Sequence, residues 1–189
     1  MTPILISGPA IEPVPLADAK QWLRVDGAAE DELISALITS ARLVVEAHTR
    51  LLLVTQTWRA LYDSWPLGEA IQIPLAPLLS LDNVKVYDAA GVGSVIPAAS
   101  YVLDYSPMGA RMAFLTTPPA PGRRLAGIEL QMILGFGPAA ADVPPTLRQA
   151  IKMLAARWFE NRGDALADST NIPGEIAALI KPFRRVRLA

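Results

Sequence analysis

The spacing of apolar residues changes twice along this chain, and those changes constrain its fold more than any other feature of the sequence. Over residues 29–49 apolar side chains recur every three or four positions, which is the period of an amphipathic helix. Between residues 53 and 137 the chain has short β-branched and aromatic segments cut by proline and glycine, which predict strands and turns. The helical period returns after Pro145, so an α+β protein is expected.

Local signals give approximate bounds for each element. A proline-rich arm precedes the first helix, which begins at Leu16 and is expected to end near Gly27. Asp142 is expected to cap the third helix, and Pro182 to end the fourth. The predicted helices span residues 16–26, 29–49, 145–162 and 175–180. The predicted strands span residues 55–62, 70–73, 83–87, 101–104, 111–115 and 127–134.

The order of these elements predicts a helical bundle made from the N- and C-terminal segments, with a β-rich subdomain inserted between them. The helical core is assigned to residues 1–52 and 138–189, which include a C-terminal arm, and the β subdomain to residues 53–137. The two helical blocks are oppositely charged, because the first has four basic and seven acidic residues and the second has eight basic and five acidic residues. Trp22, Trp58 and Trp158 are predicted to lie in the core.

The sequence lacks the groups that most enzymes need. There is no cysteine, and His48 is the only histidine, so a catalytic triad or a multi-histidine metal site would have to be built around one residue. His48 lies near the end of the long predicted helix, where an imidazolium is favourable, and is interpreted as a capping or interface residue. No catalytic residue, cofactor or metal is expected.

Other features have ordinary structural explanations. The consecutive acids Glu30, Asp31 and Glu32 point in different directions on a helix and are interpreted as a solvated first turn. The net charge of −1 predicts no basic face for duplex DNA. Met1–Ala10 does not resemble a signal peptide, and apolar runs such as Leu51–Val54 are far shorter than the roughly 20 residues of a membrane helix, so no membrane partner is expected.

The C-terminal tail, Lys181 to Leu188, is the most suggestive local feature because four cations alternate with apolar residues. It has three interpretations: it binds phosphate backbone, it docks into an acidic groove of a partner protein, or it is a solvated end. Docking to a partner is favoured, because the apolar side chains would otherwise be exposed and terminal arms commonly become ordered on binding.

Beyond these signals, the order of several sequence blocks resembles the head-tail connector family, also called adaptor or head-completion proteins, of long-tailed phages and gene transfer agents. The resemblance covers nearly the whole chain. The first blocks are Leu16-Ala-Asp-Ala-Lys-Gln-Trp-Leu-Arg-Val-Asp26, Asp31-Glu-Leu-Ile-Ser-Ala-Leu-Ile38 and Thr55-Gln-Thr-Trp58. The later blocks are Tyr101-Val-Leu-Asp104, Gly135-Phe-Gly137, Leu147-Arg-Gln-Ala-Ile151 and Trp158-Phe-Glu-Asn-Arg162. Arg50 departs from the pattern, because many relatives have glycine there, and a glycine-type helix cap is therefore not expected.

The resemblance implies a structural ring of about twelve copies between the portal protein and a stopper or tail-terminator neck protein. It implies a place at the head-tail junction of a virion assembled in the host cytoplasm, with DNA only as cargo passing through the channel. The tail residues Phe183, Arg184, Arg185, Val186, Arg187 and Leu188 are expected to bind the portal. Arg148, Lys152 and Arg157 are expected to contact the next subunit, although the two charged blocks are also able to pair within one subunit.

Three alternatives differ from this interpretation. A stopper or tail-completion protein would share the lack of catalytic chemistry but belong to a ring of lower order. A DNA-packaging accessory protein would bind DNA through Arg184, Arg185 and Arg187 in a salt-dependent way. An enzyme of a new kind is disfavoured, because no set of nucleophilic or proton-transfer groups can be assembled from the motifs.

Overall fold

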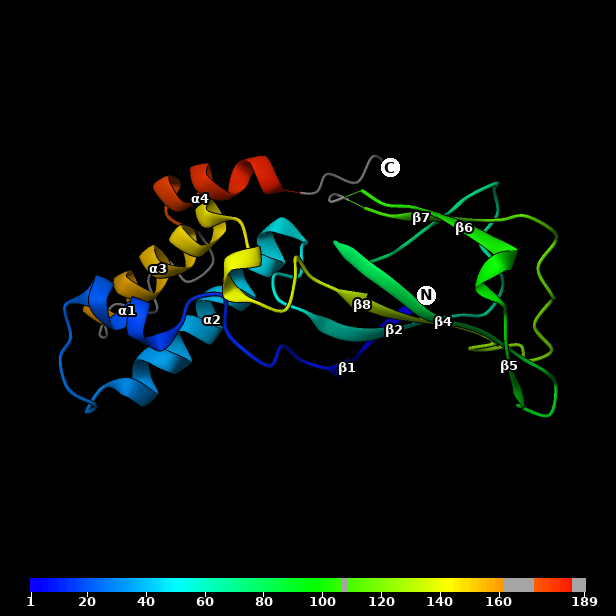
Figure 1. The fold of residues 1–189 in the computed structure, drawn as a ribbon, viewed down its shortest axis with the longest axis horizontal. Coiled ribbons are helices and arrows are strands. Elements are labelled where there is room, and N and C mark those ends of the chain that lie inside the picture. Colours follow the sequence, from blue (N-terminus) through cyan, green and yellow to red (C-terminus); the bar gives the residue numbers. More distant parts are fainter. Residues whose placement is uncertain (107–108, 162–171, 185–189) are drawn as a thin grey trace. The chain divides into compact units, whose positions relative to one another are not determined.

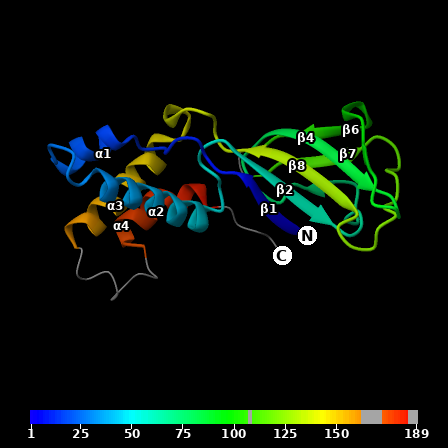
Figure 2. The same cartoon turned by 90° about the horizontal axis from the view of Figure 1, so that it is seen from below.

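The computed structural model describes residues 1–106, 109–161 and 172–184 (Figure 1, and turned by 90° in Figure 2). The chain divides into two compact units. The β-rich unit comprises Met1–Pro9 and Thr55–Phe136, and the helical unit comprises Ala10–Val54 and Gly137–Ala189. Helices and antiparallel sheets are both present, so the predicted α+β class is confirmed.

The elements lie close to their predicted positions. The helices are α1 (Leu16–Leu23), α2 (Asp31–Thr49), α3 (Pro145–Glu160) and α4 (Gly174–Ile180), with the short 3-10 turns η2 (Ala140–Asp142) and η3 (Lys181–Phe183). The strands are β1 (Thr2–Ser7), β2 (Gln56–Tyr62), β3 (Ile71–Gln72), β4 (Leu78–Tyr87), β5 (Gly93–Val95), β6 (Tyr101–Asp104), β7 (Arg111–Phe114) and β8 (Ile128–Leu134), with η1 (Ala98–Ser100) before β6.

In the helical unit, α3 packs against both α2 and α4, and α1 packs against α2 (Figure 1). The buried side chains of α2 recur every three or four residues, as the sequence predicts. Ile34, Ile38 and Val45 of α2 are almost completely buried, as are Leu147 and Ile151 of α3. Burial of this apolar stripe is what makes a helix of this length stable in water.

Arg50 ends α2 in the left-handed conformation, with φ of 60°, and its N–H donates to the Glu46 carbonyl at 2.8 Å. An arginine therefore occupies the backbone conformation that glycine adopts without strain. Arg24 ends α1 in the same way, with φ of 55°. The first helix consequently ends before the predicted position near Gly27.

Replacing Arg50 with glycine is expected to raise the free energy of unfolding by about 0.5–1 kcal/mol. The left-handed conformation costs a residue with a Cβ roughly 1–2 kcal/mol, and the greater freedom of glycine in the unfolded chain offsets part of the gain. Denaturant unfolding measures the change. Arg50→Ala is the matched control, since it removes the exposed side chain but keeps the Cβ. Equal stabilisation by both variants would contradict the explanation.

Asp142 does not cap α3. Its Oδ2 accepts a hydrogen bond from the Ala139 N–H at 2.8 Å and so closes the η2 turn. The residue before α3 is Pro144, whose side chain makes no capping hydrogen bond. The prediction was wrong because Val143 and Pro144 lie between Asp142 and the helix, which begins at Pro145, and the carboxylate meets a nearer donor.

The β-rich unit contains two antiparallel sheets, with strand orders β1-β2-β8-β4-β5 and β3-β7-β6. One face of β8 supplies the core, because Ile128, Leu130, Met132 and Leu134 are fully buried. Met112 of β7 is fully buried as well. Alternate residues of a strand point to the same face, so β8, the central strand of its sheet, has one fully apolar side.

The strand β1 and the beginning of β4 differ from the sequence prediction. Thr2–Ser7 pairs antiparallel with β2, although the sequence predicts an arm there. β4 begins at Leu78 rather than at Asn83, and its pairing with β8 shifts register twice, between Leu78 and Ser80 and between Leu81 and Asn83. Such bulges interrupt the alternation of apolar and polar residues by which a strand is recognised.

Glu129 is the one carboxylate buried in the described part of the β-rich unit, with 4% of its surface exposed. It accepts a hydrogen bond from the Tyr87 hydroxyl at 3.0 Å, and Arg59 and Lys85 lie 3.5 and 3.7 Å away. Burial, together with the hydrogen bond to this carboxylate, raises the pKa of Tyr87. The negative charge of Glu129 is thus balanced by basic side chains of the neighbouring strands β2 and β4.

Candidate interaction surface around Trp22

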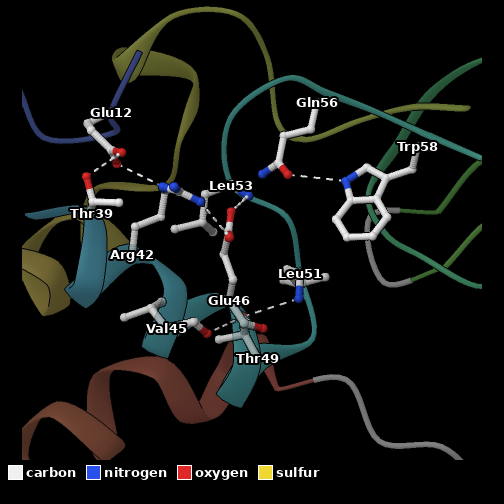
Figure 3. Close-up of polar contacts among 10 residues, drawn as sticks. All are labelled: Glu12, Thr39, Arg42, Val45, Glu46, Thr49, Leu51, Leu53, Gln56 and Trp58. Carbon is white, nitrogen blue, oxygen red and sulfur yellow. Dashed lines mark hydrogen bonds and ion pairs between the residues drawn. The ribbon is translucent and has the colours of Figure 1, made fainter. Parts of the chain in front are cut away.

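A buried polar network fastens two segments of the helical unit to α2 (Figure 3). The guanidinium of Arg42 contacts two carboxylates, with Nε 2.8 Å from Glu12 Oε2 and an Nη 2.9 Å from Glu46 Oε2. Glu12 also accepts a hydrogen bond from the Thr39 hydroxyl, and Glu46 accepts one from the Leu53 N–H at 2.9 Å. These groups bind each other, so the network has a structural explanation and is not a candidate binding site.

The three cations predicted to contact the next subunit do not share one face of α3. A helix turns by about 100° per residue, which separates Arg148 from Arg157 by about half a turn. Arg148 Nε donates to the Val143 carbonyl at 3.1 Å and is partly buried. Lys152 Nζ lies 5.2 Å from the centre of the Trp22 ring, and the Arg157 side chain is exposed. Lys152 and Arg157 each line a hollow beside Trp22, whereas Arg148 lies only about 40° from Lys152 around the helix but is held by its contact with Val143.

The prediction that Trp22 lies in the core was wrong. Its side chain is 47% exposed, whereas Ala19 is the buried residue of α1. Trp58 and Trp158 are half-buried, and the Trp58 indole N–H donates to Gln56 Oε1 at 3.2 Å (Figure 3). A two-turn helix has room for few core positions, and Trp22 stands at its last turn beside the outer side of α3.

Two hollows flank Trp22, and we call the residues that line them the Trp22 surface. The first hollow is lined by Asp18, Gln21, Trp22, Arg24 and Lys152. The second is lined by Trp22 with Met153, Ala156, Arg157 and Glu160 of α3 and Glu175 of α4, among others. An exposed tryptophan between charged side chains is typical of the residues that dominate the binding energy of protein–protein interfaces.

Two groups of ion pairs lie within the N-terminal block. Lys20 pairs with Asp31, and Arg42 pairs with Glu12 and Glu46. Five of the eleven charged residues of this block therefore have partners inside it. Pairing between the two blocks inside one subunit stays an alternative to a contact with the next subunit.

Two predicted residues of the tail belong to the described part of the chain. Phe183 is half-buried at the end of η3, and Arg184 after it is exposed. Arg185, Val186, Arg187 and Leu188 lie outside the described residues. His48 is in the last turn of α2, where its Nδ1 lies 2.9 Å from the Val44 carbonyl, which agrees with its interpretation as a residue of the helix end.

Two other kinds of feature, a metal site and a membrane helix, are absent from the described residues. No group of three or more histidine, cysteine, aspartate or glutamate residues able to hold a metal ion occurs among the residues that the structure describes. Within the same residues, no helix is long and apolar enough to cross a membrane. The Trp22 surface is therefore the site with the clearest chemistry, which is that of protein–protein contact.

Solved structures show which proteins this chain is similar to. The chain is similar to a chain from the neck of an empty gene transfer agent particle in C6 symmetry, with 27% identity and a TM-score of 0.85. It is similar to a chain from the virion of a native gene transfer agent particle (27%, 0.84) and to one from the neck of a native particle in C12 symmetry (26%, 0.81). Each match covers 100% of this chain and 98% of the other.

These neighbours support a structural protein of the neck of a phage or gene transfer agent particle, rather than an enzyme. No family model matches the chain, and no curated protein sequence matches it. The likeness extends over both units and is not limited to one of them.

Proposed function

We propose that this chain is an adaptor subunit, one of about twelve copies that form a ring between the portal protein and the stopper or tail-terminator protein. The observation that carries the proposal is the likeness, over the whole chain and at a TM-score of 0.85, to a chain from the neck of a gene transfer agent particle. An adaptor needs a stable scaffold and surfaces that contact other proteins. It needs no catalytic residue.

The copy number is supported by the symmetries of the neighbouring structures. One neck was solved in C6 and another in C12 symmetry. A twelve-membered ring satisfies both symmetries because six divides twelve, whereas a six-membered ring satisfies only the first. This argument favours an adaptor over a stopper or tail-completion protein, which would form a ring of lower order.

Within each copy we assign the ring wall to the predicted helical bundle, residues 1–52 and 138–189 without Met1–Pro9, which belongs to the β-rich unit, and the β subdomain of residues 53–137 is inserted in it. The tail residues 183–188 would then reach the portal. The described start of this tail fits such a contact, because Arg184 is exposed and follows the half-buried Phe183. Docking of this arm to a protein would leave the DNA in the channel as passing cargo.

Imaging of purified particles tests the proposal. We expect the chain in the particle neck as a ring of twelve copies, with density for residues 183–188 against the portal. Absence of the chain from the neck would reject the proposal. A six-membered ring on the tail side would favour a stopper or tail-completion protein instead. Salt-dependent DNA binding that is lost on removal of Arg184, Arg185 and Arg187, in a chain absent from the ring, would favour a packaging accessory.

A further inference from the structure

In a closed ring of identical subunits, each copy has two different and complementary surfaces. One surface binds the copy before it, and the other binds the copy after it. The Trp22 surface offers one of them, because its exposed aromatic ring lies between two hollows. If the chain forms a ring, as proposed above, another exposed face of the same subunit must complement it. The outer face of α2 has the required properties.

The outer face of α2 carries an exposed leucine in a row of polar and small residues. Leu43 is 54% exposed, although leucine in an amphipathic helix ordinarily belongs to the buried face. Glu32, Ala36, Ser40 and Ala47 are exposed at helical spacing from it and share its side. Leu43 is therefore a large, exposed apolar side chain in a row of small and polar ones.

This face and the Trp22 surface lie on the outer sides of two different helices. The buried residues of α2, such as Ile38, pack in the core with those of α3, such as Ile151. With 100° per residue, Leu43 lies about 140° from Ile38 around α2, and Ala156 lies about 140° from Ile151 around α3. Two helices that face each other through their buried sides direct their exposed sides outward, as successive copies of a ring require.

The two faces offer one local attraction between opposite charges. Glu32 near the start of α2 is exposed, and no ion pair of Glu32 occurs within the described residues. Lys152 and Arg157 of the Trp22 surface likewise have no ion pair with any described residue, and Lys152 instead lies over the Trp22 ring. Asp18, Glu160 and Glu175 also line this surface, so the attraction is between Glu32 and these two cations and does not come from a net basic surface.

We propose that the Trp22 surface of one copy binds the outer face of α2 of the next copy, with Leu43 seated in the hollow formed by Trp22, Met153 and Ala156. The partner is thus a second copy of this chain, bound through two different faces. The inference rests on the proposed function only for the closure of the ring, since the contact itself is defined by these residues.

Cysteine cross-linking tests the contact directly, because the chain has no cysteine of its own. A chain with both Leu43→Cys and Ala156→Cys, treated with a short bifunctional maleimide, is expected to give a ladder of dimer, trimer and larger products. Either substitution alone is expected to give monomer, and a mixture of the two single variants is expected to give dimer and nothing larger. A face-to-face contact between two Leu43 side chains would cross-link the single variant, and that result would overturn the proposal.

Two controls separate the contact from misfolding and from chance collision. The pair Leu43→Cys with Leu125→Cys places the second thiol on the β-rich unit, at a leucine that is 73% exposed, and is expected to give no ladder. Trp22→Ala, added to the reactive pair, is expected to reduce the ladder about tenfold. The chain is expected to remain folded, since about half of the Trp22 side chain is already exposed. An equal ladder from the control pair, or no effect of Trp22→Ala, would overturn the proposal.

The reaction is run on purified particles that carry the double variant and on concentrated purified protein. No ladder in particles whose neck contains the chain as a ring would overturn the contact and leave the adaptor role intact. A ladder in the purified protein, with the chain absent from the neck, would support the contact and reject the adaptor role. The two proposals therefore fail separately.

Discussion

Arg42→Ala is expected to lower the free energy of unfolding by about 3–5 kcal/mol, the largest effect of any single substitution considered for this chain. The Arg42 side chain is 7% exposed and contacts the carboxylates of Glu12 and Glu46, the second of which is 8% exposed. Removing the guanidinium leaves two negative groups close together with little access to water. The same change releases the segment around Glu12 from α2. Urea unfolding of the full chain, followed by circular dichroism, measures the loss.

A matched control for this prediction exists in the same chain. Arg111 pairs with Asp104, but the two side chains are 59% and 60% exposed. Exposed pairs of this kind contribute about 0–1 kcal/mol, so Arg111→Ala is expected to have little effect on unfolding. A loss below about 1 kcal/mol for Arg42→Ala, or equal losses for the two variants, would show that the buried network does not stabilise the fold.

The double charge reversal Lys152→Glu with Arg157→Glu is expected to weaken the assembly of subunits by tenfold or more. It places two acids beside Trp22, where the proposed partner face presents Glu32, and juxtaposed like charges cost several kcal/mol in an interface. Tenfold corresponds to about 1.4 kcal/mol, which is a low estimate for two reversals. Incorporation of the variant into particles, compared with the parent chain, measures the effect.

The control for this variant changes the net charge by the same amount at a distant place. Arg111→Glu with Arg124→Glu reverses two exposed cations of the β-rich unit and is expected to assemble like the parent chain. Adding Glu32→Lys to the double reversal is expected to restore part of the assembly, because opposite charges then meet again. Equal incorporation of all variants would reject an electrostatic role for the Trp22 surface.

Arg148 is left out of this variant, although the sequence places it with the other two cations. Its Nε donates to the carbonyl of Val143 within the same subunit, and reversing its charge would remove that hydrogen bond. An effect of Arg148→Glu on assembly would therefore not distinguish an interface from local unfolding. The sequence shows three cations on one predicted helix. Which two of them line the hollows beside Trp22 depends on the packing of α1 against α3, which only the structure shows.

The elements with regular periods could be predicted from the sequence to within a few residues. Residues 29–49 are predicted as a helix, and α2 spans Asp31–Thr49. The strand predicted over residues 101–104 has those bounds in the structure, as β6. Elements without a clear period were missed: β1 contains Pro3 and lies at a sheet edge, and β5 has three residues. Such strands depend on a partner strand more than on their own side chains.

The candidate site was less predictable than the fold. The basic character of α3 is visible in the sequence, but the exposure of Trp22 is not, because tryptophan is found both in cores and at interfaces. One available signal was the position of Leu43 outside the apolar stripe of residues 29–49. The early end of α1 at Arg24, in the left-handed conformation, was seen only in the structure.

Local physics in the sequence alone determined the type and approximate bounds of the helices and of most strands, the α+β class, and the scarcity of catalytic side chains. These properties depend on neighbouring residues and on composition. Only the tertiary structure decided that Arg42 meets Glu12, 30 positions away in the chain, that β1 pairs with β2, and that Trp22 faces solvent beside Lys152. Each of these depends on burial and pairing between distant segments, which are set when the whole chain packs and not by any one segment.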